Sequence, residues 1–319
     1  MEIVGDSLDG VLIGLYEKLL AEGSENLGSR GNNVELLGVT LRVLQPRARL
    51  SRSEGRGKPF SALGELLWYL SGSNKLEFIE PYIKQYKHDA VDGILEGAYG
   101  PRLLQKNGCI DQLRSIIWLL SNRPGSRRAV IQLFDADDIA VEKKEIPCTT
   151  TLQFHLRDNM LHMSVTMRSN DAYLGLPHDV FCFTMLQEML SRRLDAKIGM
   201  YIHHVGSMHI YDKHIDAVKQ YILEGHQRPN EMPEMPNRNP CDVVPILLNA
   251  ENRIRNGESF KAEDVIDDPY WADIVRLLQV HWARRRREDL SELRSAFVNQ
   301  VYLPFVNELP PTNNHDAAS

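Results

Sequence analysis

The stretch IPCTTTLQF (residues 146–154) and its continuation HLRDNMLHMSVTMRSND (155–171) decide how this chain of 319 residues is organised. Residues 149–156 are rich in β-branched and aromatic side chains, and residues 160–167 alternate between apolar and polar positions. Asp158-Asn159 between them is a turn signal. We therefore expect an antiparallel hairpin with the apolar side chains of its second strand on one face.

Pairing within this hairpin brings Cys148, at the start of one strand, close to Arg168, at the end of the other. A cation beside a thiol favours the thiolate, which is the nucleophilic form. The simpler interpretation of Cys148 is a small buried residue. LGLP (174–177) then breaks the strand and introduces a nearly all-apolar helix at 180–190, for which Pro177 and Asp179 fit a helix start.

Composition and charge exclude several classes of protein. Hydrophobic residues make up 43% and charged residues 25% of the chain, as is typical of a globular domain. The formal net charge of −6 argues against a general nucleic-acid-binding protein. No apolar run reaches membrane-spanning length, and the N-terminus lacks the basic start of a signal peptide. The four cysteines form no CxxC pair, so we expect a cytoplasmic protein without a metal site.

Helices and strands are expected to alternate along the chain. The helix expected at 60–70 carries Glu65 among apolar residues, where burial would be costly without a partner or a role; the alternative is the exposed edge of that helix. The basic segments 44–58 and 284–287 are expected to be solvated surface. The other expectations are helices at 8–22, 111–120, 267–280 and up to 303, a loop at 23–33, strands at 34–43 and 129–134, and a strand-like segment at 243–248.

Several short motifs, in their order and spacing, resemble the thymidylate synthase family. They are ELLWYL (65–70), YG (99–100), RR (127–128), PCTTTLQF (147–154), RSND (168–171), LGLP (174–177) and HIY (209–211). Together they span roughly the middle two-thirds of the chain, and several independent motifs are a stronger signal than any one of them. The resemblance implies an enzyme that transfers the one-carbon unit of 5,10-methylenetetrahydrofolate to carbon 5 of a pyrimidine nucleoside monophosphate.

The resemblance also implies the architecture. We expect an α+β fold with a mixed sheet of about six strands packed by helices. Two such sheets would stack face to face in a homodimer. We expect residues 1–319 to form a single domain whose part from about residue 225 onward is divergent.

Catalytic roles follow from the resemblance in the same way. Cys148 would add to carbon 6 of the ring, and Arg168 would hold the thiolate and touch the phosphate. Glu65 would order water and manage protons on the ring, with help from Tyr99. The alternative for Tyr99 is an ordinary turn aromatic.

Nucleotide binding is implied for a further set of residues around the phosphate, the ring and the sugar. Ser169 would add a hydroxyl to the phosphate, and the region of Asp171 would meet the carbonyl at position 2. The sugar would be bound by His209 and Tyr211. Three arginines would reach the phosphate, namely Arg30 from a loop before the first long strand and the pair Arg127 and Arg128. Arg127 and Arg128 would cross the dimer interface to the partner's site, because the guanidinium fork binds phosphate oxygens bidentately.

Asp179 departs from the family pattern, which has asparagine at this place. An amide can accept from the uracil N3–H and donate to the carbonyl at position 4, whereas cytosine has a bare N3 and an amino group. A carboxyl with one shared proton matches cytosine instead. Asp179 therefore indicates the branch of the family that hydroxymethylates CMP or dCMP. The alternative is that Asp179 caps its helix.

Other departures bear on the reaction. The family's tryptophans near residues 82–93 are replaced by Tyr82, Tyr86 and His88, Thr149 replaces a frequent histidine, and the short apolar tail that closes over folate is not recognisable. A less sealed site would let water reach the methylene carbon. Thymidylate synthesis, cytidylate methylation and a non-catalytic nucleotide-binding role remain open, as does the choice between ribose and deoxyribose.

Overall fold

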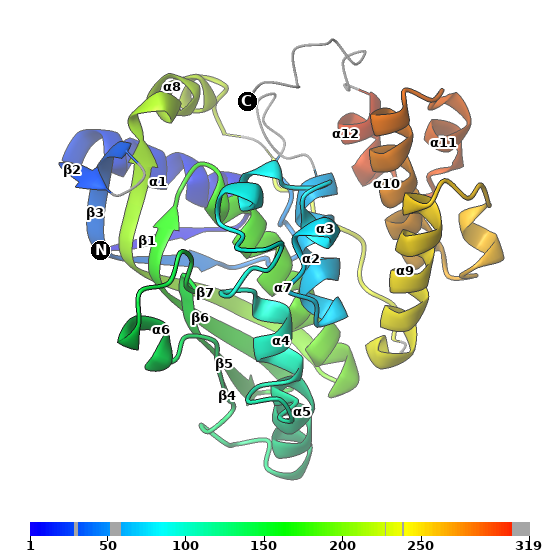
Figure 1. The fold of residues 1–319 in the computed structure, drawn as a ribbon, viewed down its shortest axis with the longest axis horizontal. Helices are drawn as coiled ribbons and strands as arrows, with labels where there is room; N and C mark the ends of the chain where they lie inside the picture. The colour runs from blue at the N-terminus through cyan, green and yellow to red at the C-terminus, as the bar shows by residue number, and fades with distance from the viewer. Residues whose placement is uncertain (29–30, 52–58, 227, 238, 308–319) are drawn as a thin grey trace.

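The computed structural model describes residues 1–28, 31–51, 59–226, 228–237 and 239–307. Arg30, the predicted phosphate ligand, lies outside these residues, as do Arg52 and Arg56 of the basic segment. Figure 1 shows a twisted sheet on one side of the molecule, with helices packed against it and a second group of helices beyond them.

A seven-stranded mixed sheet forms the centre of the described chain. Its order is β1-β3-β7-β6-β5-β4, with β2 paired to β3. The β1–β3 and β6–β7 pairs are parallel and the other pairs are antiparallel. The strands are β1 (Glu2–Gly5), β2 (Ser24–Gly28), β3 (Gly31–Val43), β4 (Val130–Gln132), β5 (Thr149–Arg157), β6 (Met160–Asp171) and β7 (Lys197–Tyr211). The α+β fold with a mixed sheet is therefore confirmed.

The predicted hairpin is β5–β6. Asp158 and Asn159 make its turn with φ angles of 50° and 57°, a left-handed conformation that matches the twist of two-residue hairpins and that Asn and Asp tolerate well. The apolar positions of β6 face the core: Leu161, Met163, Val165 and Met167 are buried. Alternation with period two therefore identified both strands and the buried face of β6.

The alternation of buried side chains slips by one residue near the ends of β6 and β7. In β6 the buried positions change from odd numbers, up to Met167, to Asn170; in β7 they change from Val205 to Met208. From Met163 to Asp171 the two strands keep one register, and Asn170 lies beside Met208. The slip turns Asn170 into the core and leaves Ser169 and Asp171 partly exposed.

Helices cover the inner face of this sheet. The apolar helix α7 (Gly175–Arg193) packs on β6 and β7, α1 (Leu8–Glu22) packs on β1 and β3, and α2 (Pro59–Ser71) packs on α7. The remaining α-helices before residue 230 are α3 (Leu76–Ile79), α4 (Tyr99–Leu104), α5 (Gln112–Asn122), α6 (Asp137–Ala140) and α8 (Ile215–Leu223). The predicted helices at 8–22, 60–70, 111–120 and 180–190 are thus confirmed within two residues at most of their ends, apart from the earlier start and later end of α7.

A second group of helices follows residue 239 and lies beyond α2 and α7 (Figure 1). It comprises α9 (Pro240–Arg255), α10 (Pro269–Arg286), α11 (Ser291–Ala296) and α12 (Leu303–Asn307). The strand-like prediction for 243–248 is wrong, because Asn239 caps a helix there and Pro240 occupies its first turn. The last predicted helix, expected to continue to residue 303, ends at Ala296 in α11, and α12 begins separately at Leu303.

Two other expectations from the sequence are corrected. Residues 24–28 form strand β2 against β3 rather than a loop, although their side chains are mostly exposed. In the basic segment Arg49 is buried, and its guanidinium is paired with the buried Glu188. A buried charge needs such a partner, so this arginine is part of the core and not of a solvated surface.

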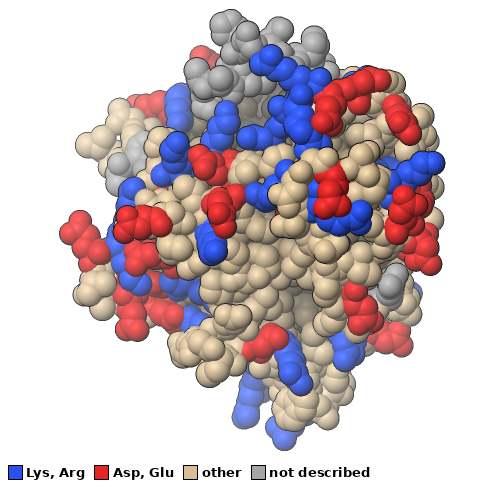
Figure 2. All heavy atoms as spheres, turned by 45° about the vertical axis from the view of Figure 1, so that its right-hand side comes forward, with Lys and Arg blue, Asp and Glu red and all other residues tan. Residues whose placement is uncertain are grey.

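Figure 2 shows Lys and Arg interspersed with Asp and Glu on the face that carries the second helix group. At 284–287, Arg286 pairs with Glu288 at 2.6 Å and Arg285 donates to the carbonyl of Pro81, which fits the predicted compensated surface. Within the described residues no helix is long and apolar enough to span a membrane, and no cluster of three His, Cys, Asp or Glu side chains could hold a metal ion.

Candidate active site

Cys148 and Arg168 meet where β5 begins and β6 ends. The backbone N–H of Arg168 donates to the carbonyl of Cys148 at 2.9 Å, and its guanidinium Nη2 lies 3.6 Å from Cys148 Sγ. Donation from Nε to the carbonyl of Pro147 at 2.9 Å fixes the guanidinium in place. Cys148 is half-buried, so a substrate can reach a thiol that a cation is placed to stabilise as thiolate.

Glu65 is buried inside α2, which excludes the exposed-edge interpretation. Its Oε1 accepts from the hydroxyls of Tyr69 at 3.0 Å and Tyr86 at 2.6 Å. Nδ1 of His178 lies 3.4 Å from Oε2. Tyr86, noted in the sequence only as a departure, thus contacts the carboxylate directly, whereas Tyr69 and His178 were not anticipated.

Tyr99 begins α4 and points its hydroxyl at β5. The hydroxyl accepts from the backbone N–H of Thr149 at 3.1 Å and from its side-chain hydroxyl at 2.9 Å. Burial raises the pKa of Tyr99 well above its usual range, and the nearby charges of Cys148 and Asp179 raise it further. Tyr99 therefore lies in one neighbourhood with both residues, and Thr149, which replaces the family's histidine, holds it there.

Asp179 lies four residues inside α7, whose N-cap position is Leu174, so the helix-cap interpretation is wrong. Its Oδ2 accepts from Nδ2 of the buried Asn170 at 2.8 Å. Burial raises the pKa of Asp179 well above its usual range, and the charges of Glu65 and Asp171 act in the same direction, whereas the bond from Asn170 opposes them. Burial and these charges therefore shift Asp179 toward its neutral form.

The candidates for phosphate and sugar binding lie at the ends of β6 and β7. Ser169 is beside Ser207, and Asp171 is beside His209. Oδ1 of Asp171 accepts from the backbone N–H groups of Tyr173 and Leu174, so this side chain shapes the turn into α7. The rings of His209 and Tyr211 meet edge to face with centroids 5.0 Å apart.

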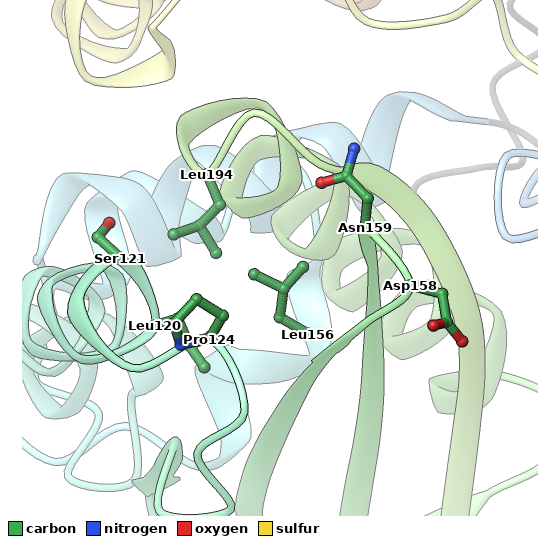
Figure 3. Close-up of a pocket in the computed structure, with 7 residues that line it drawn as sticks. All are labelled: Leu120, Ser121, Pro124, Leu156, Asp158, Asn159 and Leu194. Carbon is green, nitrogen blue, oxygen red and sulfur yellow. The ribbon is translucent and has the colours of Figure 1, made fainter.

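Arg127 and Arg128 are exposed just before β4. One hollow of about 330 Å³ lies near the β5–β6 turn and the end of α5 (Figure 3). Its lining is Leu120, Ser121, Pro124, Leu156, Asp158, Asn159 and Leu194, which includes none of the candidate site residues.

Tyr82 replaces one of the family's tryptophans, and the second helix group encloses it. Its hydroxyl donates to Glu251 of α9 at 2.7 Å and accepts from the indole N–H of Trp282 of α10 at 3.0 Å. The ring of His281 stacks on it with centroids 4.5 Å apart. Tyr82 therefore packs against the C-terminal helices and does not present its face to a bound ring.

A thiol beside a guanidinium, with buried acids and phenols around it, fits the class of enzymes that work by covalent nucleophilic addition. Comparison with known sequences agrees. Residues 56–250 match the thymidylate synthase family. The chain therefore belongs to the thymidylate synthase family, whose members use methylenetetrahydrofolate to transfer a one-carbon unit to a pyrimidine nucleotide.

Similar proteins include thymidylate synthases from three bacteria. The one from Buchnera aphidicola subsp. Baizongia pistaciae (strain Bp) is 32% identical over 191 residues, which is 58% of this chain and 71% of the relative. The Bacillus subtilis subsp. natto enzyme is 32% identical over 185 residues, 55% and 64% of the two chains. The enzyme from Francisella philomiragia subsp. philomiragia is 30% identical over 177 residues, 51% and 65% of the two chains.

Proposed function

We propose that this enzyme adds a hydroxymethyl group to carbon 5 of a cytidylate, CMP or dCMP, through a covalent adduct on Cys148. The observation that carries the proposal is the buried carboxyl of Asp179, bonded to Asn170 at the place of the family's asparagine, whose pKa burial raises well above its usual range. A neutral carboxyl offers an O–H to the bare N3 of cytosine and an acceptor to its amino group. Uracil would leave a buried polar group unpaired, at a cost of about 1–3 kcal/mol.

In this proposal the thiolate of Cys148 forms a C–S bond with carbon 6, and the ring electron pair moves to carbon 5, which becomes nucleophilic. Methylenetetrahydrofolate supplies the one-carbon unit, and the net reaction consumes one water and releases tetrahydrofolate. Glu65 and Tyr99 take the proton that carbon 5 must lose, after which the thiolate leaves carbon 6. Arg168 stabilises the thiolate at both stages.

The residues near Glu65 can receive the folate, but with different side chains from the family's tryptophans. Tyr82 is enclosed by α9 and α10, so its ring is not a surface for the pterin. We propose that Tyr86 and the quarter-exposed His178, both bound to Glu65, form the wall that receives it. Their polar groups would also hold water beside the reacting carbon, in keeping with a hydroxymethyl product.

Thymidylate synthesis is the second candidate, and the printed names of the similar proteins favour it. It would require Asp179 to accept the uracil N3–H. A purely nucleotide-binding role is less well supported, because a binding module has little use for a thiol held beside a guanidinium.

A product assay separates these candidates. The purified protein is incubated with methylenetetrahydrofolate and, separately, CMP, dCMP, UMP and dUMP, and the nucleotides are analysed by mass spectrometry. We expect a hydroxymethyl adduct on a cytidylate, abolished in Cys148→Ala and retained in the matched variant Cys109→Ala, whose cysteine is exposed. A methyl group on dUMP would establish thymidylate synthesis instead, and tight binding without product would establish the binding role.

A further inference from the structure

A chain of buried hydrogen bonds runs from β7 to the carboxyl of Asp179. The hydroxyl of Tyr201 lies 2.7 Å from Nδ1 of His203, and Nε2 of His203 lies 3.0 Å from Oδ1 of Asn170. Nδ2 of Asn170 lies 2.8 Å from Oδ2 of Asp179. Tyr201 and His203 are fully buried, and Asn170 is 4% exposed. Asn170 enters this chain because of the slip that turns it into the core.

The imidazole of His203 carries one proton. Burial, with a smaller effect of the neighbouring His204, lowers its pKa to about 3. A neutral imidazole donates from one nitrogen and accepts at the other. The whole chain can therefore run in only two ways, toward Asp179 or away from it.

The two directions place the acid proton of Asp179 on different oxygens. When the chain runs toward Asp179, Oδ2 accepts from Asn170, and the acid proton stays on Oδ1, where it can be donated. When the chain runs away, the amide of Asn170 is reversed and Oδ2 must donate its own proton to it. Oδ1 is then only an acceptor, which suits the N3–H of uracil.

Tyr201 decides between these directions. Its hydroxyl has His203 as its one hydrogen-bond partner in the described part of the protein. Burial raises the pKa of Tyr201 well above its usual range, so the phenol keeps its proton. Accepting from His203 would leave that proton buried without a partner, whereas donating to Nδ1 satisfies it. The phenol therefore donates.

We propose that Tyr201, His203 and Asn170 form a one-way hydrogen-bond chain that directs a donor onto Oδ2 of Asp179 and thereby keeps the acid proton on Oδ1 for N3 of a cytosine. This inference rests on the proposed function. The three residues are positioning residues, because they act on the base through Asp179. Oδ2 keeps a second lone pair for the amino group of the same base.

The first test compares nucleotide affinities in Tyr201→Phe, which removes the directing hydroxyl and keeps the ring. Dissociation constants for CMP, dCMP, UMP and dUMP are measured by calorimetry. We expect the preference for cytidylate over uridylate to fall about tenfold. This is the effect of losing one buried hydrogen bond in the cytidylate complex but not in the uridylate complex. Tyr16→Phe is the matched control, because it removes another buried phenol, bonded to the carbonyl of Ala172. It should leave the preference unchanged.

The second test reads the tautomer of His203 without any substrate. In protein labelled with ¹⁵N in histidine, we expect His203 to carry its proton on Nε2 between pH 5 and 9. Its signal is assigned by its absence in a His203→Asn variant. A proton on Nδ1 would overturn the proposed direction.

The outcomes distinguish a failure of the proposed function from a failure of the hydrogen-bond chain. Wild-type preference for uridylate would overturn the proposed function, and this inference with it. Wild-type preference for cytidylate that persists in Tyr201→Phe would overturn the inference alone. Equally weaker binding of all four nucleotides by Tyr201→Phe would also overturn it, since that result would mean that Tyr201 has a purely structural role.

Discussion

At Asp179, burial and the charge of Glu65 raise the pKa of the carboxyl well above its usual range. The native state therefore holds a proton that the unfolded chain releases above its ordinary pKa of 3.8. Stability from this group is present below that pH and is lost as pH rises toward the native pKa. We expect Asp179→Asn, which cannot ionise, to be more stable than wild type, by an amount that grows as pH rises above 3.8.

The same variant should reverse base preference, because an amide matches uracil. We expect the ratio of kcat/KM for cytidylate over uridylate to fall roughly 10- to 100-fold. Denaturant unfolding between pH 3 and 8 and steady-state kinetics measure the two effects. Asp216→Asn, at a fully exposed carboxylate, is the control for both. Parallel stability curves for wild type and Asp179→Asn would contradict the neutral carboxyl.

The contribution of His203 to stability depends on pH in the opposite direction from that of Asp179. The native pKa of His203, about 3, lies below the ordinary value of 6.5, so its stabilisation is complete above pH 6.5 and is lost as pH falls toward 3. Between pH 6.5 and 3, this group should lower the free energy of unfolding by roughly 1.4 kcal/mol for each pH unit. We expect His203→Gln to show a shallower loss of unfolding free energy on acidification. The exposed His88→Gln should follow wild type, and an equal slope in both variants would refute the assignment.

Single residues were predictable where one motif carries them and not where distant segments meet. Cys148, Arg168, Glu65 and Tyr99 stand in recognisable motifs. The structure places Arg168 and Tyr99 near Cys148, and Glu65 reaches Tyr99 through the ring of Tyr69. The contact of Asn170 with His203 could not be foreseen, because it depends on a slip of alternation in two parallel strands. Glu65 was found as an acid among apolar residues, but its phenol partners lie on other turns and loops.

Among the elements, β6 and β7 depend on a close approach at Gly206. A Cβ there would meet the carbonyl oxygen of Arg168 at 2.8 Å, and backbone cannot yield as a flexible side chain can. We expect Gly206→Ala to lower unfolding free energy by about 1–3 kcal/mol and to reduce kcat, because the displaced strand carries Arg168 away from Cys148. Gly125→Ala is the control, since nothing lies near its added methyl group. Wild-type activity in Gly206→Ala would contradict this coupling.

Elements with strong periodicity were predicted well, and those formed by context were not. The hairpin β5–β6 and helices α1, α2 and α5 follow from alternation, helical spacing and turn residues. Strand β2 has a Gly, Ser and Asn composition typical of loops and exists because β3 offers an edge to pair with. In α9 the β-branched pair Val243-Val244 indicated a strand, but the cap at Asn239 and packing against α2 and α7 outweigh that local preference.

On the scale of the whole molecule, the exposed Arg127 and Arg128 are predicted to complete the site of a partner subunit. A mixture of two inactive variants tests this prediction. Cys148→Ala and Arg127→Ala, denatured together and refolded in equal amounts, should regain about one quarter of wild-type activity, because half of the dimers then contain one intact site of two. Sedimentation should show a dimer. Activity no higher than that of the separate variants would contradict a shared site.

The contact of Tyr82 with Glu251 and Trp282 has a consequence for chimaeras built from this protein. Recognisable similarity ends at residue 250, one position before Glu251, and begins at residue 56, after the strand β3 that pairs with β7. The segment that is similar to known relatives is therefore shorter than the segment whose residues pack together. A transplant limited to the recognisable segment would leave a phenol without its acceptor and a sheet without its neighbour, so an exchange between relatives must carry both flanks along.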